Sequence, residues 1–298
     1  MPARAALPIA HALSETLGAH FDERSRRAVN GGSINQAFEY RGARESVFVK
    51  VSSAPHASQM FRAESAGLKA LAQAQGVRVP RVIAQGTCAE GAYLALEWIS
   101  FGHASRATEA TLGEQLAWQH RCTREQHGWD RDNTIGSTPQ PNAPCADWVE
   151  FFRERRLRFQ LDLAAPNGCD PDVLDRGYRL CEALDAFFTS YRPTPSLLHG
   201  DLWSGNWGGD EDGLPVIFDP AVYFGDRETD IAMTRLFGGF GPAFYAAYQS
   251  TWPLDAGAPT RLSLYNLYHV LNHYNLFGGG YLRQAEGMIN RLLAELSR

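Results

Sequence analysis

The stretch between residues 197 and 219 restricts the fold and the chemistry of this chain more than any other part. An apolar pair leads into the tripeptide His-Gly-Asp, which ends at Asp201, and Asn206 follows five positions later. Asp219 then ends the apolar run Val-Ile-Phe, a pattern typical of a buried strand. The sequence therefore predicts two carboxylates and one carboxamide beside buried apolar segments.

These three side chains match the requirements of phosphoryl transfer. In that reaction one carboxylate orients the acceptor hydroxyl and takes its proton, while a carboxamide and a second carboxylate hold Mg²⁺ on the nucleotide phosphates. We predict that Asp201 is the base and that Asn206 and Asp219 are the metal ligands. The alternative is a plain turn, because aspartate, glycine and asparagine are common loop residues. The second aspartate, after its apolar run, favours the catalytic interpretation.

The first hundred residues contain candidate contacts for the phosphates of a nucleotide. Gly31, Gly32 and Ser33 lie between two β-type segments, and the backbone N–H groups of such a turn could cover phosphates. An ordinary hairpin turn is the alternative, because the full spacing of a phosphate-binding glycine motif is missing.

Lys50 lies within the apolar strand pattern of residues 47–51. Because a buried lysine is costly unless it is paired, we predict that Lys50 holds nucleotide phosphates and pairs with Glu64. Glu64 lies early in a predicted helix over residues 59–75, whose apolar side chains have helical spacing. The alternatives are a solvated lysine on an edge strand and a solvated glutamate on the helix surface.

A predicted strand over residues 93–99 is followed by a polar, glycine-containing segment at 100–105. We place a boundary between two lobes there, with an ATP-binding N-lobe over residues 1–99 and a catalytic and substrate-binding C-lobe over 100–298. The end of the strand is the predicted hinge, where backbone groups would contact the adenine of a nucleotide. The hinge residues are Glu97, Trp98 and Ile99.

Helical patterns dominate the second part of the chain, over residues 111–121, 147–164, 171–191 and 259–298. Residues 122–145 are rich in proline, glycine and asparagine, so we predict an irregular segment there. A loop of this length in a compact domain is often functional.

The helix over residues 147–164 carries four arginines among glutamates, and we predict a solvated face rather than a nucleic-acid patch. They are Arg153, Arg155, Arg156 and Arg158.

Further along the chain, Asp230 is predicted to brace the catalytic loop. No Ala-Pro-Glu motif follows it, which argues against a protein kinase.

Composition excludes several other classes of protein. The chain has 298 residues and a net charge of −5. Its overall charge therefore creates no positive electrostatic field that would attract nucleic acid or an anionic membrane. No apolar run approaches the roughly 18 residues that a membrane span needs. The five cysteines form no Cys-x-x-Cys pair, which favours reduced thiols in a cytoplasmic protein. A monomer is the expected state.

Taken together, these segments resemble the fructosamine kinase (ketosamine-3-kinase) family, which is related to aminoglycoside and choline kinases. The resemblance covers nearly the whole chain, and its most specific parts extend beyond the catalytic residues that these kinases share. They are Phe48-Val49-Lys50-Val51, Met60-Phe61 with Glu64, Gly128-Trp129, residues 136–142 (Gly-Ser-Thr-Pro-Gln-Pro-Asn), residues 147–152, residues 198–206 and Leu271-Asn272-His273-Tyr274-Asn275.

This resemblance implies an α+β, two-lobed protein-kinase-like fold with a small antiparallel-sheet N-lobe and a larger, mainly helical C-lobe. It also implies that ATP, with Mg²⁺, phosphorylates the 3-hydroxyl of a ketosamine. The ketosamine would be a fructosamine, ribulosamine or erythrulosamine, carried by a small amine or by a glycated protein. The 3-phosphate is unstable, so its elimination would free the amine and complete a deglycation.

The resemblance further implies that Trp203 and His273 line the sugar site, where an aromatic plane and a ring nitrogen suit a sugar. The alternatives are a core tryptophan and a structural helix histidine.

Ser33 stands where many relatives carry a cysteine, so the resemblance does not extend to a thiol switch in that loop.

Two other functions compete with ketosamine phosphorylation. The first is a different small-molecule kinase of the same fold, acting on an amino alcohol or an aminosugar as aminoglycoside and choline kinases do. The segments at 129–142 and 272–273 favour the ketosamine kinase over it. The second is a non-catalytic nucleotide-binding protein, against which the joint presence of the four predicted active-site side chains argues. These are Lys50, Asp201, Asn206 and Asp219.

Overall fold

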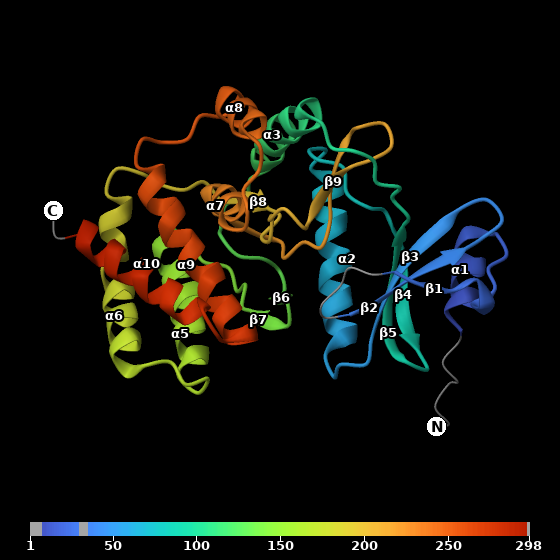
Figure 1. Cartoon of the computed structure of the whole chain (residues 1–298), viewed down its shortest axis with the longest axis horizontal. Coiled ribbons are helices and arrows are strands. Elements are labelled where there is room, and N and C mark those ends of the chain that lie inside the picture. Colours follow the sequence, from blue (N-terminus) through green and yellow to red (C-terminus); the bar gives the residue numbers. More distant parts are fainter. Residues whose placement is uncertain (1–7, 30–34, 297–298) are drawn as a thin grey trace.

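The N-terminal part of the chain forms a five-stranded antiparallel sheet (Figure 1). The structure, a computed structural model, describes residues 8–29 and 35–296. The strands follow the order β1-β2-β3-β5-β4 across the sheet. They are β1 (Arg27–Ala28), β2 (Gln36–Arg41), β3 (Ser46–Ser52), β4 (Val82–Cys88) and β5 (Gly91–Glu97). β3 carries three valines and a phenylalanine, residue types that suit a pleated, partly buried surface, and β5 carries a tyrosine and two leucines.

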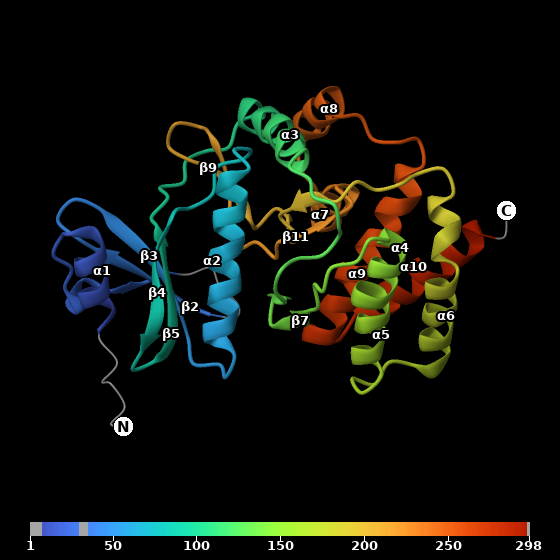
Figure 2. The ribbon, with the colours of Figure 1, turned by 180° about the vertical axis from the view of Figure 1, so that it is seen from behind.

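The two faces of this sheet bury different side chains, because residues alternate along a strand. Val47, Val49 and Val51 of β3 pack with α1 (Ile9–Leu17) in a small apolar cluster. Lys50 lies on the other face, where its ammonium group meets Glu64 of α2 (Ala57–Gln73). Figures 1 and 2 show α2 between the sheet and the rest of the molecule. The alternation of β3 thus directs Lys50 toward the C-lobe.

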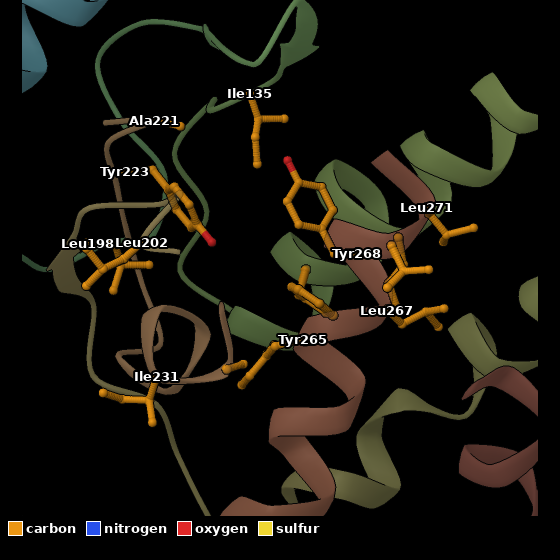
Figure 3. Packing of buried hydrophobic residues seen from close by; sticks show 14 of the residues in the cluster. Ile135, Leu198, Leu202, Ala221, Tyr223, Ile231, Tyr265, Leu267, Tyr268 and Leu271 are labelled. Carbon is orange, nitrogen blue, oxygen red and sulfur yellow. The ribbon is translucent and has the colours of Figure 1, made fainter. Parts of the chain in front are cut away.

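The remainder of the chain is mainly helical. Its helices are α3 (Arg106–His120), α4 (Trp148–Phe152), α5 (Phe159–Ala164), α6 (Pro171–Glu182), α7 (Glu228–Leu236), α8 (Pro242–Thr251), α9 (Ala258–Phe277) and α10 (Tyr281–Glu295). Leu68 of α2 belongs to the same buried cluster as C-lobe residues, so the core continues from one lobe into the other. Figure 3 shows Leu198, Ile231 and Tyr268 converging in this cluster from three different elements. No helix in the described part of the chain is long and apolar enough to cross a membrane.

Three short two-stranded antiparallel sheets lie between these helices. They are β6 (Asn133–Ile135) with β7 (Thr138–Gln140), β8 (Ser196–Leu198) with β11 (Tyr223–Gly225), and β9 (Trp207–Gly209) with β10 (Pro215–Ile217). The predicted catalytic loop connects β8 to β9, and Asp219 follows β10 by two residues. The fold therefore brings the two ends of the catalytic segment together.

The hairpin of β6 and β7 corrects the prediction of an irregular segment over residues 122–145. Strands of three residues are too short for a periodic apolar pattern, and three of their four buried side chains are polar. Gln140 donates to the side chain of Asn133 at 2.8 Å and to the carbonyl oxygen of Ala221 at 3.1 Å. This hairpin therefore supports the backbone just beyond Asp219.

Arg156 contradicts the prediction that all four arginines of the 147–164 helix lie on a solvated face. A π-helical segment, Arg153–Arg158, joins α4 to α5 and breaks the regular spacing on which that prediction depended. The guanidinium of Arg156 is fully buried and donates to the carbonyl oxygen of Pro141 and the side chain of Asn142, each at 2.7 Å. Arg153, Arg155 and Arg158 stay partly exposed.

The other predicted helices exist with different ends. The pattern over residues 171–191 gives α6 and then a 3₁₀ segment, Leu184–Phe188. The pattern over 259–298 gives two helices, α9 and α10, because three consecutive glycines interrupt it at residues 278–280.

Candidate active site

Backbone hydrogen bonds fasten the catalytic loop to the segment around Asp219. The N–H of Ala221 donates to the carbonyl oxygen of His199 at 2.8 Å, and the N–H of Phe218 donates to that of Asn206 at 3.0 Å. The imidazole Nε2 of His199 lies 2.9 Å from the carbonyl oxygen of Phe218, so this nitrogen carries the proton. The two segments therefore keep a fixed relation to each other.

Asp230 of α7 braces the start of the catalytic loop, as predicted. Its carboxylate accepts hydrogen bonds from the N–H groups of His199 at 2.7 Å and Gly200 at 2.8 Å. It also lies 3.1 Å from Nε2 of His120 on α3. Gly200 has a positive φ of 84°, and a Cβ there would collide with the carbonyl oxygen of Ala221. Only glycine fits this turn.

Asp201, the predicted base, lies next to the carboxamide of Asn206. The amide nitrogen of Asn206 donates to the backbone oxygen of Asp201 at 2.9 Å and to its carboxylate at 3.3 Å. Burial, followed by the nearby charge of Asp219, raises the pKa of Asp201 to about 7. A carboxylate whose pKa lies near neutrality is suited to accept a proton from a hydroxyl.

Lys50 connects the N-lobe sheet with both acidic partners. Its ammonium nitrogen lies 2.6 Å from Glu64 and 2.6 Å from Asp219, so the predicted Lys50–Glu64 pair is present. Burial alone would lower the pKa of Lys50, but the charges of Asp219 and Glu64 outweigh it and raise that pKa. Lys50 is therefore a fixed cation, and the alternative of a solvated edge lysine does not hold.

The side chains of Asn206 and Asp219 have the right chemistry for Mg²⁺. Because the amide nitrogen of Asn206 donates to Asp201, its carboxamide oxygen is the atom available to a cation. The carboxylate of Asp219 is 47% exposed, and its residue adopts a positive φ of 57°. Such backbone strain is common at functional sites.

Within the described residues, no group of three or more histidine, cysteine, aspartate or glutamate side chains could hold a metal ion by itself. Asn206 and Asp219 offer one carboxamide and one carboxylate, which suits an ion that takes one or two protein ligands and completes its coordination with phosphate and water oxygens, as Mg²⁺ usually does.

The predicted hinge lies where β5 ends. The carboxylate of Glu97 accepts hydrogen bonds from Arg78 at 2.8 Å and from the N–H of Arg81 at 3.1 Å, so its side chain is already engaged. The ring of Trp98 lies 6.5 Å from that of Phe48, and Ile99 is partly exposed. The prediction that backbone groups here contact adenine remains compatible with this arrangement.

The predicted glycine turn, Gly31, Gly32 and Ser33, lies outside the described residues. Its role in covering phosphates therefore stays a prediction.

Trp203 and His273 lie on one side of the catalytic loop but do not form a ring contact with each other. Phe237, which follows α7, separates them: its ring centroid lies 6.3 Å from Trp203 and 4.6 Å from His273. Trp203 is 37% exposed, which does not suit a core tryptophan. Nδ1 of His273 lies 2.8 Å from the carbonyl oxygen of His269, as a structural helix histidine would also show.

Sequence reasoning missed three aromatic residues in this region. Phe237 comes near His273 only through the packing of α7 on α9, so no local pattern reveals it. Phe277 lies four residues after His273 on α9, and that helical spacing was a usable signal. Tyr281 begins α10, beyond a glycine break that hides its proximity to His273.

Comparison with known sequences points to one family. The sequence profile described as fructosamine kinase matches residues 6–295. The "Probable ketoamine kinase" of Synechocystis sp. is 46% identical over 300 residues, covering 98% of this chain and 99% of the relative. The chloroplastic protein-ribulosamine 3-kinase of Oryza sativa subsp. indica is 42% identical over 272 residues, covering 90% and 79% respectively.

Solved structures agree with the predicted fold. The crystal structure of "Putative fructosamine-3-kinase" from Haemophilus somnus 129PT has a TM-score of 0.88 at 29% identity and covers 96% of both chains. A thermostable mutant of aminoglycoside phosphotransferase APH(4)-Ia, in a ternary complex with ADP and hygromycin B, has a TM-score of 0.62 at 14% identity, covering 96% of this chain and 98% of that one. The α+β, two-lobed protein-kinase-like fold is thereby confirmed.

Proposed function

This chain belongs to the fructosamine kinase family, and on that premise we propose that it phosphorylates the 3-hydroxyl of ketosamines with ATP. The observation that carries the proposal is the convergence of Lys50, Asp219 and the Asp201–Asn206 pair in one place. Relatives named ketoamine kinase and protein-ribulosamine 3-kinase support the choice of acceptor.

We assign ATP binding to the N-terminal lobe, and the catalytic loop and acceptor site to the C-terminal lobe. Residues 1–99 would hold ATP, with the glycine turn at 31–33 over the phosphates, Lys50 paired with Glu64, and the hinge at 97–99 against the adenine. Residues 100–298 would carry the catalytic loop and the acceptor site. A more distant neighbour of the same fold binds ADP, which supports nucleotide use.

In the proposed reaction Asp201 accepts the proton of the acceptor hydroxyl. The hydroxyl oxygen forms a bond to the γ-phosphorus of ATP, and the bond between that phosphorus and the bridging oxygen breaks to leave ADP. Lys50 balances negative charge on the phosphates, and Asp230 keeps the loop in place through His199 and Gly200. When bound by Asn206 and Asp219, Mg²⁺ supplies further positive charge on the phosphate oxygens.

On the acceptor side, Trp203 and His273 would face the sugar of the ketosamine. The 3-phosphate of such a product is unstable, so its elimination would release the amine and complete a deglycation. We also propose that glycated proteins are substrates besides small ketoamines, and that the chain acts as a cytoplasmic monomer. Its net charge of −5 supports substrates other than nucleic acid.

An ATP-consumption assay over a panel of acceptors tests this function. The panel contains ribulosamine, erythrulosamine and fructosamine derivatives of one alkylamine, together with choline and an aminoglycoside. Turnover restricted to the ketoamines is the expected result. Turnover only with choline or the aminoglycoside would instead identify a different small-molecule kinase, and binding of ATP without any turnover would indicate a non-catalytic protein.

A further inference from the structure

An aromatic row extends outward from the catalytic loop. It consists of Trp203, Phe237, His273, Phe277 and Tyr281. Trp203 begins the row, and its backbone N–H donates to the carbonyl oxygen of Asp201 at 3.2 Å. Phe237 links Trp203 to His273, whose ring centroid lies 5.7 Å from Phe277 and 5.2 Å from Tyr281. The row is therefore a series of neighbouring rings, and its first member follows the predicted base by two residues.

The two ends of this row are open to solvent. Trp203 is 37% exposed and Phe277 is 58% exposed, although both are large apolar side chains. Exposed apolar surface beside a predicted active site is a common mark of ligand binding. Since the row is contiguous with the catalytic loop, the ligand that covers it is most simply a part of the acceptor substrate.

His273 adds a hydrogen-bond acceptor to the row. Its Nδ1 lies 2.8 Å from the carbonyl oxygen of His269, which can only accept, so Nδ1 carries the proton. Burial lowers the pKa of His273, which favours the neutral ring, and in the neutral ring with its proton on Nδ1 the lone pair is on Nε2. A neutral acceptor among aromatic rings attracts a cation that carries an N–H, because the faces of such rings are negative.

We propose that the aromatic row binds the protonated secondary amine of the ketosamine and the first methylenes of its substituent. This inference rests on the proposed function. In a ketosamine the amine is attached to C1, and C2 alone separates C1 from the carbon that bears the 3-hydroxyl. With the hydroxyl at Asp201, the ammonium group must therefore lie close to the start of the row at Trp203. Nε2 of His273 accepts its N–H, and the exposed ring of Phe277 covers the alkyl stem.

This assignment explains how a site with common phosphoryl-transfer chemistry selects an amine-linked sugar. A free ketose offers a hydroxyl to Asp201 but no cation to the row. A ketosamine offers both. The row can therefore distinguish a ketosamine from a free ketose, which the catalytic residues alone cannot do.

The test compares two acceptors that differ in one atom. One is a 1-deoxy-1-(butylamino) ketose, and the other is the matching 1-O-butyl ether, which carries no charge. For the wild-type enzyme we expect KM for the ether to be roughly 3–30-fold higher than for the amine, the range of a partly desolvated cation–π contact. The two values of kcat should differ less.

Variants in the row then separate charge recognition from apolar packing. Tyr281→Leu removes a ring beside His273, so it should raise KM for the amine about 2–10-fold and should reduce the ratio between ether and amine. Phe277→Ala should raise KM for amine and ether alike, because this ring covers the butyl stem that both acceptors carry. A loss of apolar contact alone would raise both values equally, because the butyl group is the same. Trp118→Ala is the matched control, since Trp118 is 53% exposed on α3 and lies outside the row.

The outcomes distinguish this inference from the function on which it rests. Equal KM values for amine and ether in the wild-type enzyme would overturn the cation site while leaving ketosamine phosphorylation intact. An unchanged ratio in Tyr281→Leu would do the same. Absence of turnover with both acceptors, despite ATP binding, would overturn the proposed function and the inference with it.

Discussion

The ammonium nitrogen of Lys50 lies 2.6 Å from Oδ1 of Asp219, although 169 positions separate the two residues in sequence. The same nitrogen lies 2.6 Å from Glu64, so one cation joins a strand of the sheet, the adjacent helix and the proposed metal ligand. In this arrangement Lys50 neutralises two carboxylates, and nucleotide phosphates would compete with Asp219 for it. The pair thus couples nucleotide binding to the catalytic segment.

Replacement of Lys50 by methionine should therefore reduce both turnover and stability. A point charge on the phosphates is lost, and Glu64 is left buried without its cation, which should cost about 3–5 kcal/mol in the free energy of unfolding. The double variant Lys50→Met/Glu64→Gln removes the uncompensated charge and should recover part of that stability but no activity. Urea unfolding and ATP turnover measure the two effects. Recovery of activity in the double variant would contradict a phosphate role for Lys50.

Replacement of Asp201 by asparagine should lower kcat by roughly two to four orders of magnitude, the usual range for a general base. The affinity for ATP should change little, because the substitution keeps the shape of the side chain. Stopped-flow turnover and ATP titration on one preparation provide both values. Near-normal kcat in the folded variant would remove Asp201 from the role of base.

The same substitution should stabilise the protein at alkaline pH. The pKa of Asp201 is raised from 3.8 to about 7 by burial and by the charge of Asp219. The unfolded chain therefore loses this proton first, so the stability contributed by this carboxyl group is present below about pH 4 and is lost as pH rises through 7. Asp201→Asn stays neutral, and its free energy of unfolding should exceed that of the wild type by about 1–3 kcal/mol at pH 8.

Measurements of the free energy of unfolding at pH 4 and pH 8 check the sign of this pH dependence. The difference between wild type and Asp201→Asn should nearly vanish at pH 4. The control Asp212→Asn removes an exposed carboxylate outside the site. An equal gain for Asp201→Asn at both pH values would show that packing, rather than ionisation, causes the stabilisation.

Replacement of Asp219 by alanine should abolish turnover that depends on Mg²⁺, because the phosphates would lose their main neutralising ion. Alanine also tolerates the positive φ of 57° poorly, which should cost about 1 kcal/mol of stability. Asp219→Asn tolerates that backbone conformation better and lacks the charge, so it should lose activity with little change in melting temperature. Activity that survives complete chelation of divalent metal would refute the metal assignment.

Local sequence patterns predicted those parts of the site that lie close together in the chain. The spacing of Asp201, Asn206 and Asp219 is visible because one short loop and one hairpin carry all three. The Lys50–Glu64 pair was also accessible, since alternation along β3 and the start of the next helix define it. The roles assigned to these residues remain predictions that the substitutions above test.

Features that depend on tertiary packing were not accessible in this way. The contact of Phe237 with His273 arises where the end of α7 approaches α9. The burial of Arg156 follows from a π-helical segment, which no apolar periodicity reveals. Asn133 and Gln140 look like loop residues in sequence, yet they bond to each other and support the backbone near Asp219. Buried polar networks of this kind are specified by partners rather than by local pattern.

Replacement of Trp203 by alanine tests the acceptor site. If the indole faces the sugar, the substitution should raise KM for a ribulosamine or fructosamine roughly 5-fold or more, since a stacking surface contributes on the order of 1 kcal/mol. KM for ATP should hardly change, because Trp203 lies on the side of the loop that faces Phe237 and His273. Removing a ring that is 37% exposed should lower the melting temperature only slightly. A large fall in melting temperature, with both KM values raised alike, would instead identify Trp203 as a structural residue of the catalytic loop.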